Sequence, residues 1–142
     1  MKHRILVLED NLLNYELLRD WLEGEGYEVV FAENLSAGFV AVREYGPQLV
    51  LLDIQLGADN GLLFAKWMNE EPEDRRIPVI AVTAQAMPAE RERILESGCK
   101  ACILKPVDFV LLRKSLKRWL PAGDPARSLP LRISDGGKTT GR

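Results

Sequence analysis

Five short apolar runs divide this sequence at regular intervals, and they constrain the fold more than any other feature. They are rich in β-branched residues and mostly uninterrupted, which is typical of strands buried on both faces of a parallel sheet. The runs occupy residues 5–8, 27–32, 49–52, 79–82 and 101–104. The stretches between them carry apolar residues at helical spacing, which predicts helices over residues 12–23, 35–45, 61–71, 88–97 and about 108–120.

Strand and helix therefore alternate five times, an order that predicts an α/β fold. Short parallel strands joined by right-handed helical crossovers give a three-layer sandwich. We expect a doubly wound, flavodoxin-like (βα)5 architecture, with a five-stranded parallel sheet in the order 2-1-3-4-5. The 142 residues fit one domain over residues 1–120, and residues 121–142, rich in Pro and Gly, read as a disordered C-terminal tail. A docking role for that tail is an open alternative.

The first helix has clear boundary signals. Asn11 is a good N-cap, and Gly24 suits the position just after the helix. Helical spacing predicts a buried stripe made of Leu13, Leu17, Leu18 and Trp21. Leu12 and Tyr15 then fall, with Arg19, on the outer side, where we expect either a kinase-docking patch beside the acidic residues or scattered surface apolar residues.

Charge and composition exclude several classes of protein. The 19 basic and 21 acidic residues give a net charge of −2, which argues against a nucleic-acid partner. No apolar run approaches the roughly 20 residues that a membrane span needs, so no membrane insertion is expected. Two cysteines cannot frame a disulfide scaffold, and a cytoplasmic location follows. Cys99 and Cys102 are interpreted as ordinary buried cysteines, with redox sensing and metal binding as alternatives.

Polar residues follow the apolar runs in a set of complementary chemistry. Glu9 and Asp10 follow the first run, Asp53 the third, Thr83 the fourth and Lys105 the fifth. In open α/β sheets, ligands bind beyond the carboxyl ends of the strands where the strand order reverses, so these side chains are expected to converge. Charged residues at strand ends are individually common, because strands end at the surface.

Three clustered carboxylates repel one another unless a cation lies among them. Mg²⁺ suits oxygen ligands and completes its shell with phosphate oxygens. Lys105 and Thr83 add a positive charge and a hydroxyl donor, which together match a phosphoryl group. Asp53 stands alone at its strand end and is the candidate nucleophile, which would form an aspartyl phosphate.

Residues 3–120 resemble the receiver domain of two-component response regulators, especially stand-alone receivers and receivers of hybrid kinases. The resemblance rests on Leu-Glu-Asp-Asn at 8–11, Leu-Leu-Asp-Ile-Gln at 51–55, Ala-Val-Thr-Ala at 81–84, Leu-Lys-Pro at 104–106, Ile77-Pro78, Gly61 and Gly98. It implies that Asp53 accepts a phosphoryl group from a phosphohistidine of a sensor histidine kinase or histidine phosphotransfer protein. It also implies Mg²⁺ bound by Asp10, Asp53 and the main-chain carbonyl of Gln55, with Glu9 acting through water.

The resemblance assigns further roles around the phosphoryl group. Lys105 would contact that group, positioned by a cis bond to Pro106, and Thr83 would move toward it. Gln55 and Gln85 occupy positions that tune the lifetime of the aspartyl phosphate. Three departures from the family pattern stand out, the first being Glu9 where aspartate is commoner. Gly57 replaces a usual proline, which predicts a more mobile loop, and Cys102 replaces an aromatic switch residue.

The expected function is a single-domain regulator that signals by protein–protein interaction. It would catalyse only its own phosphorylation and dephosphorylation, so it is not expected to be an enzyme in the usual sense. A downstream protein target is expected on residues 84–97, the strand at 101–104 and the last helix. The alternatives are an adaptor that works without phosphorylation and a Mg²⁺-dependent phosphatase with an aspartyl nucleophile. Haloacid-dehalogenase-type phosphatases need Asp-x-Asp after the first strand, which is absent here.

Overall fold

Five parallel strands form one sheet in the computed structural model, which describes residues 2–85 and 87–121. The strands are β1 (Arg4–Leu8), β2 (Glu28–Ala32), β3 (Leu49–Asp53), β6 (Val79–Thr83) and β7 (Ala101–Leu104). They lie in the order β2-β1-β3-β6-β7, which confirms the predicted doubly wound arrangement.

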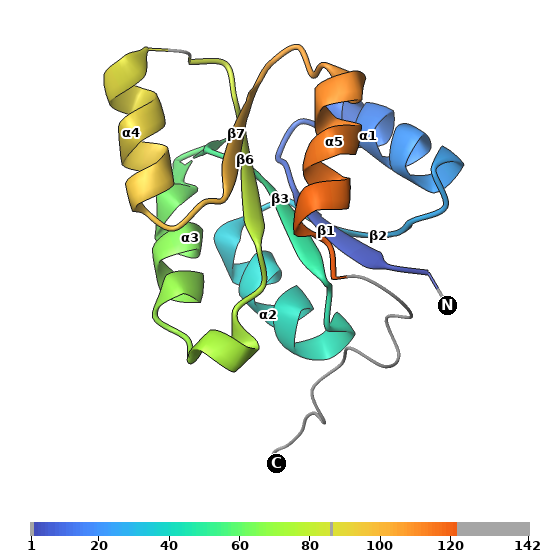
Figure 1. Ribbon diagram of the computed structural model, residues 1–142, viewed down its shortest axis with the longest axis horizontal. Helices are drawn as coiled ribbons and strands as arrows, with labels where there is room; N and C mark the ends of the chain where they lie inside the picture. Colours follow the sequence, from blue (N-terminus) through green and yellow to red (C-terminus); the bar gives the residue numbers. More distant parts are fainter. Residues whose placement is uncertain (1, 86, 122–142) are drawn as a thin grey trace.

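Helices cover both faces of the sheet (Figure 1). One face carries α1 (Leu12–Gly24) and α5 (Phe109–Trp119), and the other carries α2 (Leu35–Tyr45), α3 (Leu62–Asn69) and α4 (Pro88–Glu96). A 3-10 turn, η1 (Glu73–Arg75), precedes β6. None of the helices in the described ranges has the length and apolar character needed to cross a bilayer.

The core consists of two apolar clusters, one on each face of the sheet. Alternate strand residues point to opposite faces, so Leu6 and Leu8 of β1 contribute to one cluster while Ile5 and Val7 contribute to the other. Phe64 of α3 is the largest fully buried side chain. Burial of every residue of β3 and β6 explains why these strands appear in the sequence as continuous apolar runs.

A small antiparallel hairpin was not expected from the sequence. It joins β4 (Gln55–Leu56) to β5 (Asp59–Asn60) directly after β3. Its strands are too short to produce a periodic pattern. Gly57 lies in the turn with a φ of 57°, a left-handed conformation that suits glycine. The predicted mobility of this loop stays a prediction.

The buried face of α1 differs from the expected stripe. Tyr15, Leu18 and Leu22 are buried, whereas Leu13 and Leu17 are 66% and 57% exposed. The placement of Tyr15 on the outer side was wrong, because its ring packs against Phe31 of β2 with centroids 4.1 Å apart. Apolar residues surround most of this helix, so their spacing alone could not select the buried side.

The ends of α1 show one correct and one incorrect prediction. Asn11 is the N-cap, and its side chain accepts a hydrogen bond from the backbone of Asn14. Gly24, however, is still helical, and the left-handed glycine is Gly26, with a φ of 95°.

The tail predicted for residues 121–142 lies outside the described residues except for Pro121, whose carbonyl oxygen is 3.0 Å from His3 Nε2.

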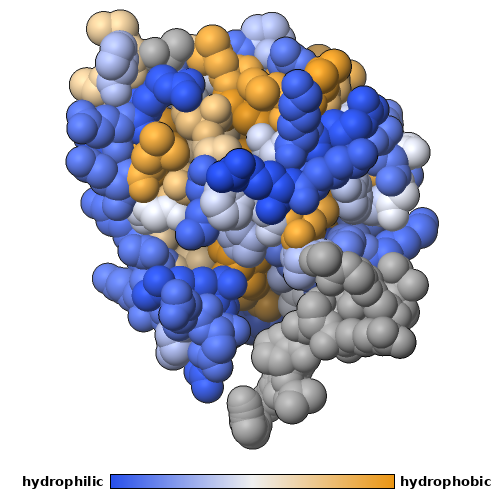
Figure 2. All heavy atoms as spheres, viewed as in Figure 1, coloured by the Kyte–Doolittle hydropathy of each residue, from blue (hydrophilic) through white to orange (hydrophobic). Residues whose placement is uncertain are grey.

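Hydrophobic side chains also gather on the molecular surface between α4 and α5 (Figure 2). We use the name α4–α5 surface for the exposed apolar residues Met87 before α4, Leu95 of α4, Leu104 of β7 and Leu111 of α5.

Candidate functional site

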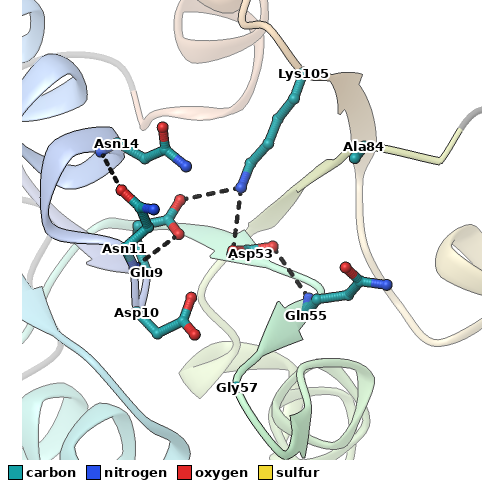
Figure 3. A pocket seen from close by; sticks show the side chains of 9 residues that line it. All are labelled: Glu9, Asp10, Asn11, Asn14, Asp53, Gln55, Gly57, Ala84 and Lys105. Atoms are coloured by element: carbon teal, nitrogen blue, oxygen red, sulfur yellow. Dashed lines mark hydrogen bonds and ion pairs between the residues drawn. The ribbon is translucent and has the colours of Figure 1, made fainter.

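The carboxyl edge of the sheet holds a pocket of about 320 Å³ (Figure 3). The segments that follow β1, β3 and β7 bring together acidic and basic side chains that are far apart in the sequence. The pocket is lined by Glu9, Asp10, Asn11, Asn14, Asp53, Gln55, Gly57, Ala84 and Lys105. This arrangement is the convergence expected at the switch point of a doubly wound sheet.

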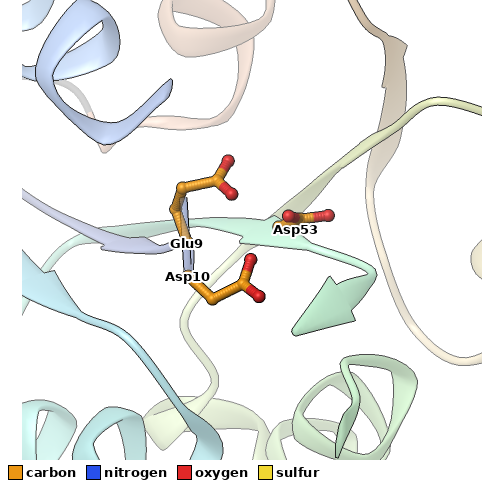
Figure 4. Close-up of side chains that lie close together, drawn as sticks. All are labelled: Glu9, Asp10 and Asp53. Carbon is orange, nitrogen blue, oxygen red and sulfur yellow. The ribbon is translucent and has the colours of Figure 1, made fainter. Parts of the chain in front are cut away.

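Three carboxylates form an acidic cluster at the centre of this pocket. One oxygen from each of Glu9, Asp10 and Asp53 lies within 4.8 Å of the others (Figure 4). Glu9 is only 2% exposed and Asp53 only 7%, whereas Asp10 is exposed. The cluster offers only oxygen ligands, which is the donor set that Mg²⁺ prefers.

Lys105 lies between the two buried carboxylates of the cluster. Its Nζ is 3.1 Å from Asp53 Oδ2 and 3.3 Å from Glu9 Oε1. Burial alone would lower the pKa of Lys105, but the carboxylates of Asp53 and Glu9 outweigh it and raise that pKa above its ordinary value. The ammonium group is therefore charged and partly balances the cluster.

Glu9 carries the strongest electrostatic perturbation of the cluster. Burial, together with the nearby Asp53, raises the pKa of Glu9 from its ordinary 4.5 to about 7. Lys105 and a hydrogen bond from the backbone N–H of Asn11 to Oε2, at 3.3 Å, oppose this rise. Because the buried carboxyl group of Glu9 resists ionisation, the site can accept more positive charge than Lys105 alone supplies.

The backbone fixes the position of Asp53. The backbone N–H of Gln55 donates to Asp53 Oδ1 at 3.0 Å. Gly61, the N-cap of α3, packs so closely that a Cβ atom there would lie 2.5 Å from the Asp53 carbonyl oxygen. At the ends of β6 and β7, the backbone N–H of Lys105 donates to the Thr83 carbonyl at 2.7 Å, and the Lys105–Pro106 bond is cis, as predicted.

Several predicted site residues lie outside the pocket. Thr83 is buried, and its Oγ1 accepts a hydrogen bond from the backbone of Gln85 at 3.1 Å, while its neighbour Ala84 lines the pocket instead. Gln85 is exposed and is not among the residues that line the pocket. Cys102 is half-buried and packs against the core cluster on the α4 side of the sheet. Leu12 is exposed on α1, as expected.

Four pocket residues were not expected to line the site: Asn11, Asn14, Gly57 and Ala84. A signal for the two asparagines was present in the sequence, because they lie about one helical turn apart directly after Glu9 and Asp10. Residues with this spacing share a helix face, and this face begins at the acidic pair.

The cysteines take no part in the pocket, and both are free thiols. Burial raises the pKa of the Cys99 thiol to about 11, and burial also raises that of Cys102 despite the opposing charge of Arg91. Thiols with raised pKa values are poor nucleophiles and metal ligands. These features support their interpretation as ordinary cysteines.

Comparisons with known proteins agree with this geometry. Residues 5–117 match the profile of the response regulator receiver domain. The polar-differentiation response regulator DivK of Brucella anthropi is 42% identical over 120 residues, which is 84% of this chain and 98% of the relative. DivK of Brucella ovis is 41% identical over the same shares of both chains.

Solved structures share the fold. The signal receiver domain of a DNA-binding response regulator from Colwellia psychrerythraea superposes with a TM-score of 0.77 at 26% identity, covering 82% of this chain and 97% of that one. The receiver domain of a sensor histidine kinase from Pseudomonas aeruginosa, with a magnesium ion coordinated in its active site cleft, has a TM-score of 0.71 at 30% identity, covering 84% and 98%. The fold, the acidic pocket and the match over most of the sequence together show that this chain belongs to the response regulator receiver domain family of two-component signalling.

Proposed function

We propose that this receiver accepts a phosphoryl group on Asp53 from a phosphohistidine of a sensor histidine kinase or histidine phosphotransfer protein. The observation that carries the proposal is the contact between Asp53 Oδ2 and Lys105 Nζ, 3.1 Å apart, inside an acidic pocket at the sheet edge. The proposed receiver comprises residues 1–120 and acts in the cytoplasm. It is a signalling protein of the DivK type and is not a classical enzyme.

The chemistry follows from the environment of Asp53. A carboxylate oxygen attacks phosphorus, the phosphorus–nitrogen bond breaks, and the departing imidazole keeps the electron pair. The hydrogen bond from Gln55 to Oδ1 orients the carboxylate for this attack. Lys105 already faces Asp53 and can follow the incoming charge onto the phosphoryl oxygens.

The acidic cluster fits Mg²⁺. We assign its direct ligands to Asp10, Asp53 and the carbonyl oxygen of Gln55, with Glu9 acting through water. When bound, the ion supplies positive charge to the phosphoryl oxygens. Asp10 is exposed, so the cluster is open on that side to the waters that Mg²⁺ retains.

The proposed output is a protein–protein contact on the α4–α5 surface. Thr83 lies at the end of β6, next to Ala84 in the pocket, so movement of this segment can reach α4. Cys102 of β7 is half-buried against the core and is too small to act by the rotation of an aromatic ring. We propose that Thr83 and the following segment carry the signal, while Gln55 and Gln85 tune its lifetime.

We propose the exposed side of α1 as the docking surface for the phosphoryl donor. Leu12, Leu13 and Leu17 are exposed there, and the same helix lines the pocket with Asn14. A donor must contact this rim to reach Asp53. The buried Tyr15 is therefore assigned to packing and is withdrawn from the docking surface.

Docking is tested by phosphotransfer kinetics from a cognate kinase. Leu12→Asp is expected to slow transfer at least tenfold without changing labelling by acetyl phosphate. Val40→Asp, at an exposed apolar site of α2 on the opposite face of the sheet, provides the control. Equal transfer rates for Leu12→Asp and wild type would remove α1 from the docking surface.

The proposed function is tested by intact-protein mass spectrometry after incubation with acetyl phosphate and Mg²⁺, and with candidate histidine kinases. Wild type is expected to gain one phosphoryl group, and Asp53→Asn is expected to gain none. Asp74→Asn, an exposed change in η1, should label like wild type. Absence of labelling in wild type under both conditions would contradict the proposal and leave an adaptor that only retains the fold.

A further inference from the structure

We propose that the carboxamide of Asn14 is a positioning group that orients the water that hydrolyses the aspartyl phosphate. The inference rests on the proposed function, and it adds a determinant of how long the signal lasts. Asn14 lies in the first turn of α1 and lines the pocket. Its carboxamide extends from the wall of α1 toward Glu9 and Lys105 (Figure 3).

The side chain of Asn14 is not needed to begin the helix. The cap uses only its backbone N–H, which donates to Asn11 Oδ1 at 3.0 Å. Helix α2 begins in the same way, with Asn34 Oδ1 accepting from the backbone N–H of Ala37 at 2.8 Å. Alanine thus serves in α2 at the position that asparagine occupies in α1, so the carboxamide of Asn14 has no role in capping.

The carboxamide is also free of competing contacts. Among residues 2–85 and 87–121, none of the hydrogen bonds involves the side chain of Asn14, although the residue is half-buried. Asparagine is a poor helix former compared with alanine. A half-buried amide that faces a polar pocket without a protein partner has its donors and its acceptor available for water or a ligand.

Several neighbouring groups are already engaged or directed elsewhere. Glu9 and Asp53 contact Lys105, and Asn11 uses its side-chain oxygen for the helix cap. The Gln55 side chain is exposed and extends away from the three carboxylates in Figure 3. Asn14 is therefore the carboxamide that approaches the site from the α1 wall with its oxygen unused.

Hydrolysis requires a water oxygen to attack phosphorus while the bond between phosphorus and the Asp53 oxygen breaks. The electron pair returns to the Asp53 carboxylate, and the proton of the water passes to the released phosphate or to solvent. An amide oxygen that accepts a hydrogen bond from this water holds it near the phosphorus and lowers the entropic part of the barrier. A neutral amide does this without changing the charge of the cluster.

The test measures the lifetime of the modification. Wild type, Asn14→Ala, Asn14→Gln and the control Glu16→Ala are labelled with acetyl phosphate and Mg²⁺, freed of excess reagent, and followed by intact mass. Asn14→Ala should lengthen the half-life roughly fivefold, the effect of one ordinary neutral hydrogen bond. Asn14→Gln keeps the carboxamide, so its half-life should stay within about twofold of the wild-type value. Glu16→Ala should have the same half-life as wild type.

Each outcome has a distinct meaning. An unchanged half-life in Asn14→Ala overturns the inference, and a shorter one does so too, because it shows that the side chain shields the phosphoryl group from water. Longer half-lives in both Asn14 variants also overturn it, since the carboxamide would then not be the active feature. Wild type that never acquires label on Asp53 would defeat the proposed function and this inference together. Urea unfolding of Asn14→Ala should show stability equal to or above that of wild type.

Discussion

Replacing Glu9 by glutamine removes a buried negative charge while preserving the shape of the side chain. Glu9 is nearly inaccessible, and burial with the neighbouring Asp53 raises its pKa to about 7. The folded protein therefore binds the proton of Glu9 more tightly than the unfolded chain does. For a carboxyl group with a raised pKa, stability is highest below the unfolded pKa and falls as the pH rises through the folded pKa.

The size of the effect follows from the two pKa values. A rise from 4.5 to about 7 corresponds to at most about 3 kcal/mol of lost stability between pH 4.5 and pH 7. Asp10 beside Glu9 is exposed, and the water that enters the pocket there lowers the cost of charging Glu9, so we expect a loss of about 1 to 2 kcal/mol. Domains of this size are stable by about 5–15 kcal/mol, so the change is readily measurable.

The assay is urea denaturation at pH 5 and pH 8, in the presence of a chelator that removes divalent cations. The free energy of unfolding of wild type should fall from pH 5 to pH 8. The fall for Glu9→Gln should be smaller by about 1 to 2 kcal/mol. Glu92→Gln, on the exposed side of α4, should behave like wild type. An identical pH dependence for wild type and Glu9→Gln would refute the reasoning, because the cost of burying this charge would then be negligible.

Three further substitutions test how the site is built. Gly61→Ala places a Cβ atom against the Asp53 carbonyl, so urea unfolding should show a loss of about 1–3 kcal/mol, whereas Gly24→Ala meets open space and should be neutral or stabilising. Lys105→Met should reduce acetyl phosphate labelling at least tenfold in a mass assay, because it removes the cation beside Asp53. Phe64→Ala should cost about 3–5 kcal/mol in urea unfolding, because it opens a cavity in the core.

The strand order and the main site residues were accessible from the sequence for a physical reason. Buried parallel strands leave continuous apolar runs, and each run ends where the chain reaches the edge of the sheet. The rule that ligands bind at the switch point then places Glu9, Asp10, Asp53 and Lys105 together without any knowledge of distances. The structure confirms this convergence.

The rotation of α1 could not be predicted in the same way. Leu13 and Leu17 are four residues apart, as are the buried Leu18 and Leu22, so both pairs match a buried stripe equally well. Which side of α1 is buried depends on Phe31 of the edge strand β2, whose ring packs against that of Tyr15. Such contacts join distant parts of the sequence and leave no local pattern.

That rotation has a direct consequence for the site. Because Tyr15 and Leu18 face the sheet, Asn14 is turned toward the pocket and the leucines are turned toward solvent. The burial of this one side of α1 thus gives the helix two roles. It directs the carboxamide of Asn14 toward the phosphoryl site, and it exposes an apolar surface beside that site. Substituting Tyr15 by alanine should disturb both, so it should slow phosphotransfer from a kinase and also change the half-life of the aspartyl phosphate. If Tyr15→Ala altered neither rate while lowering stability, the packing of α1 and the function of its two surfaces would be independent.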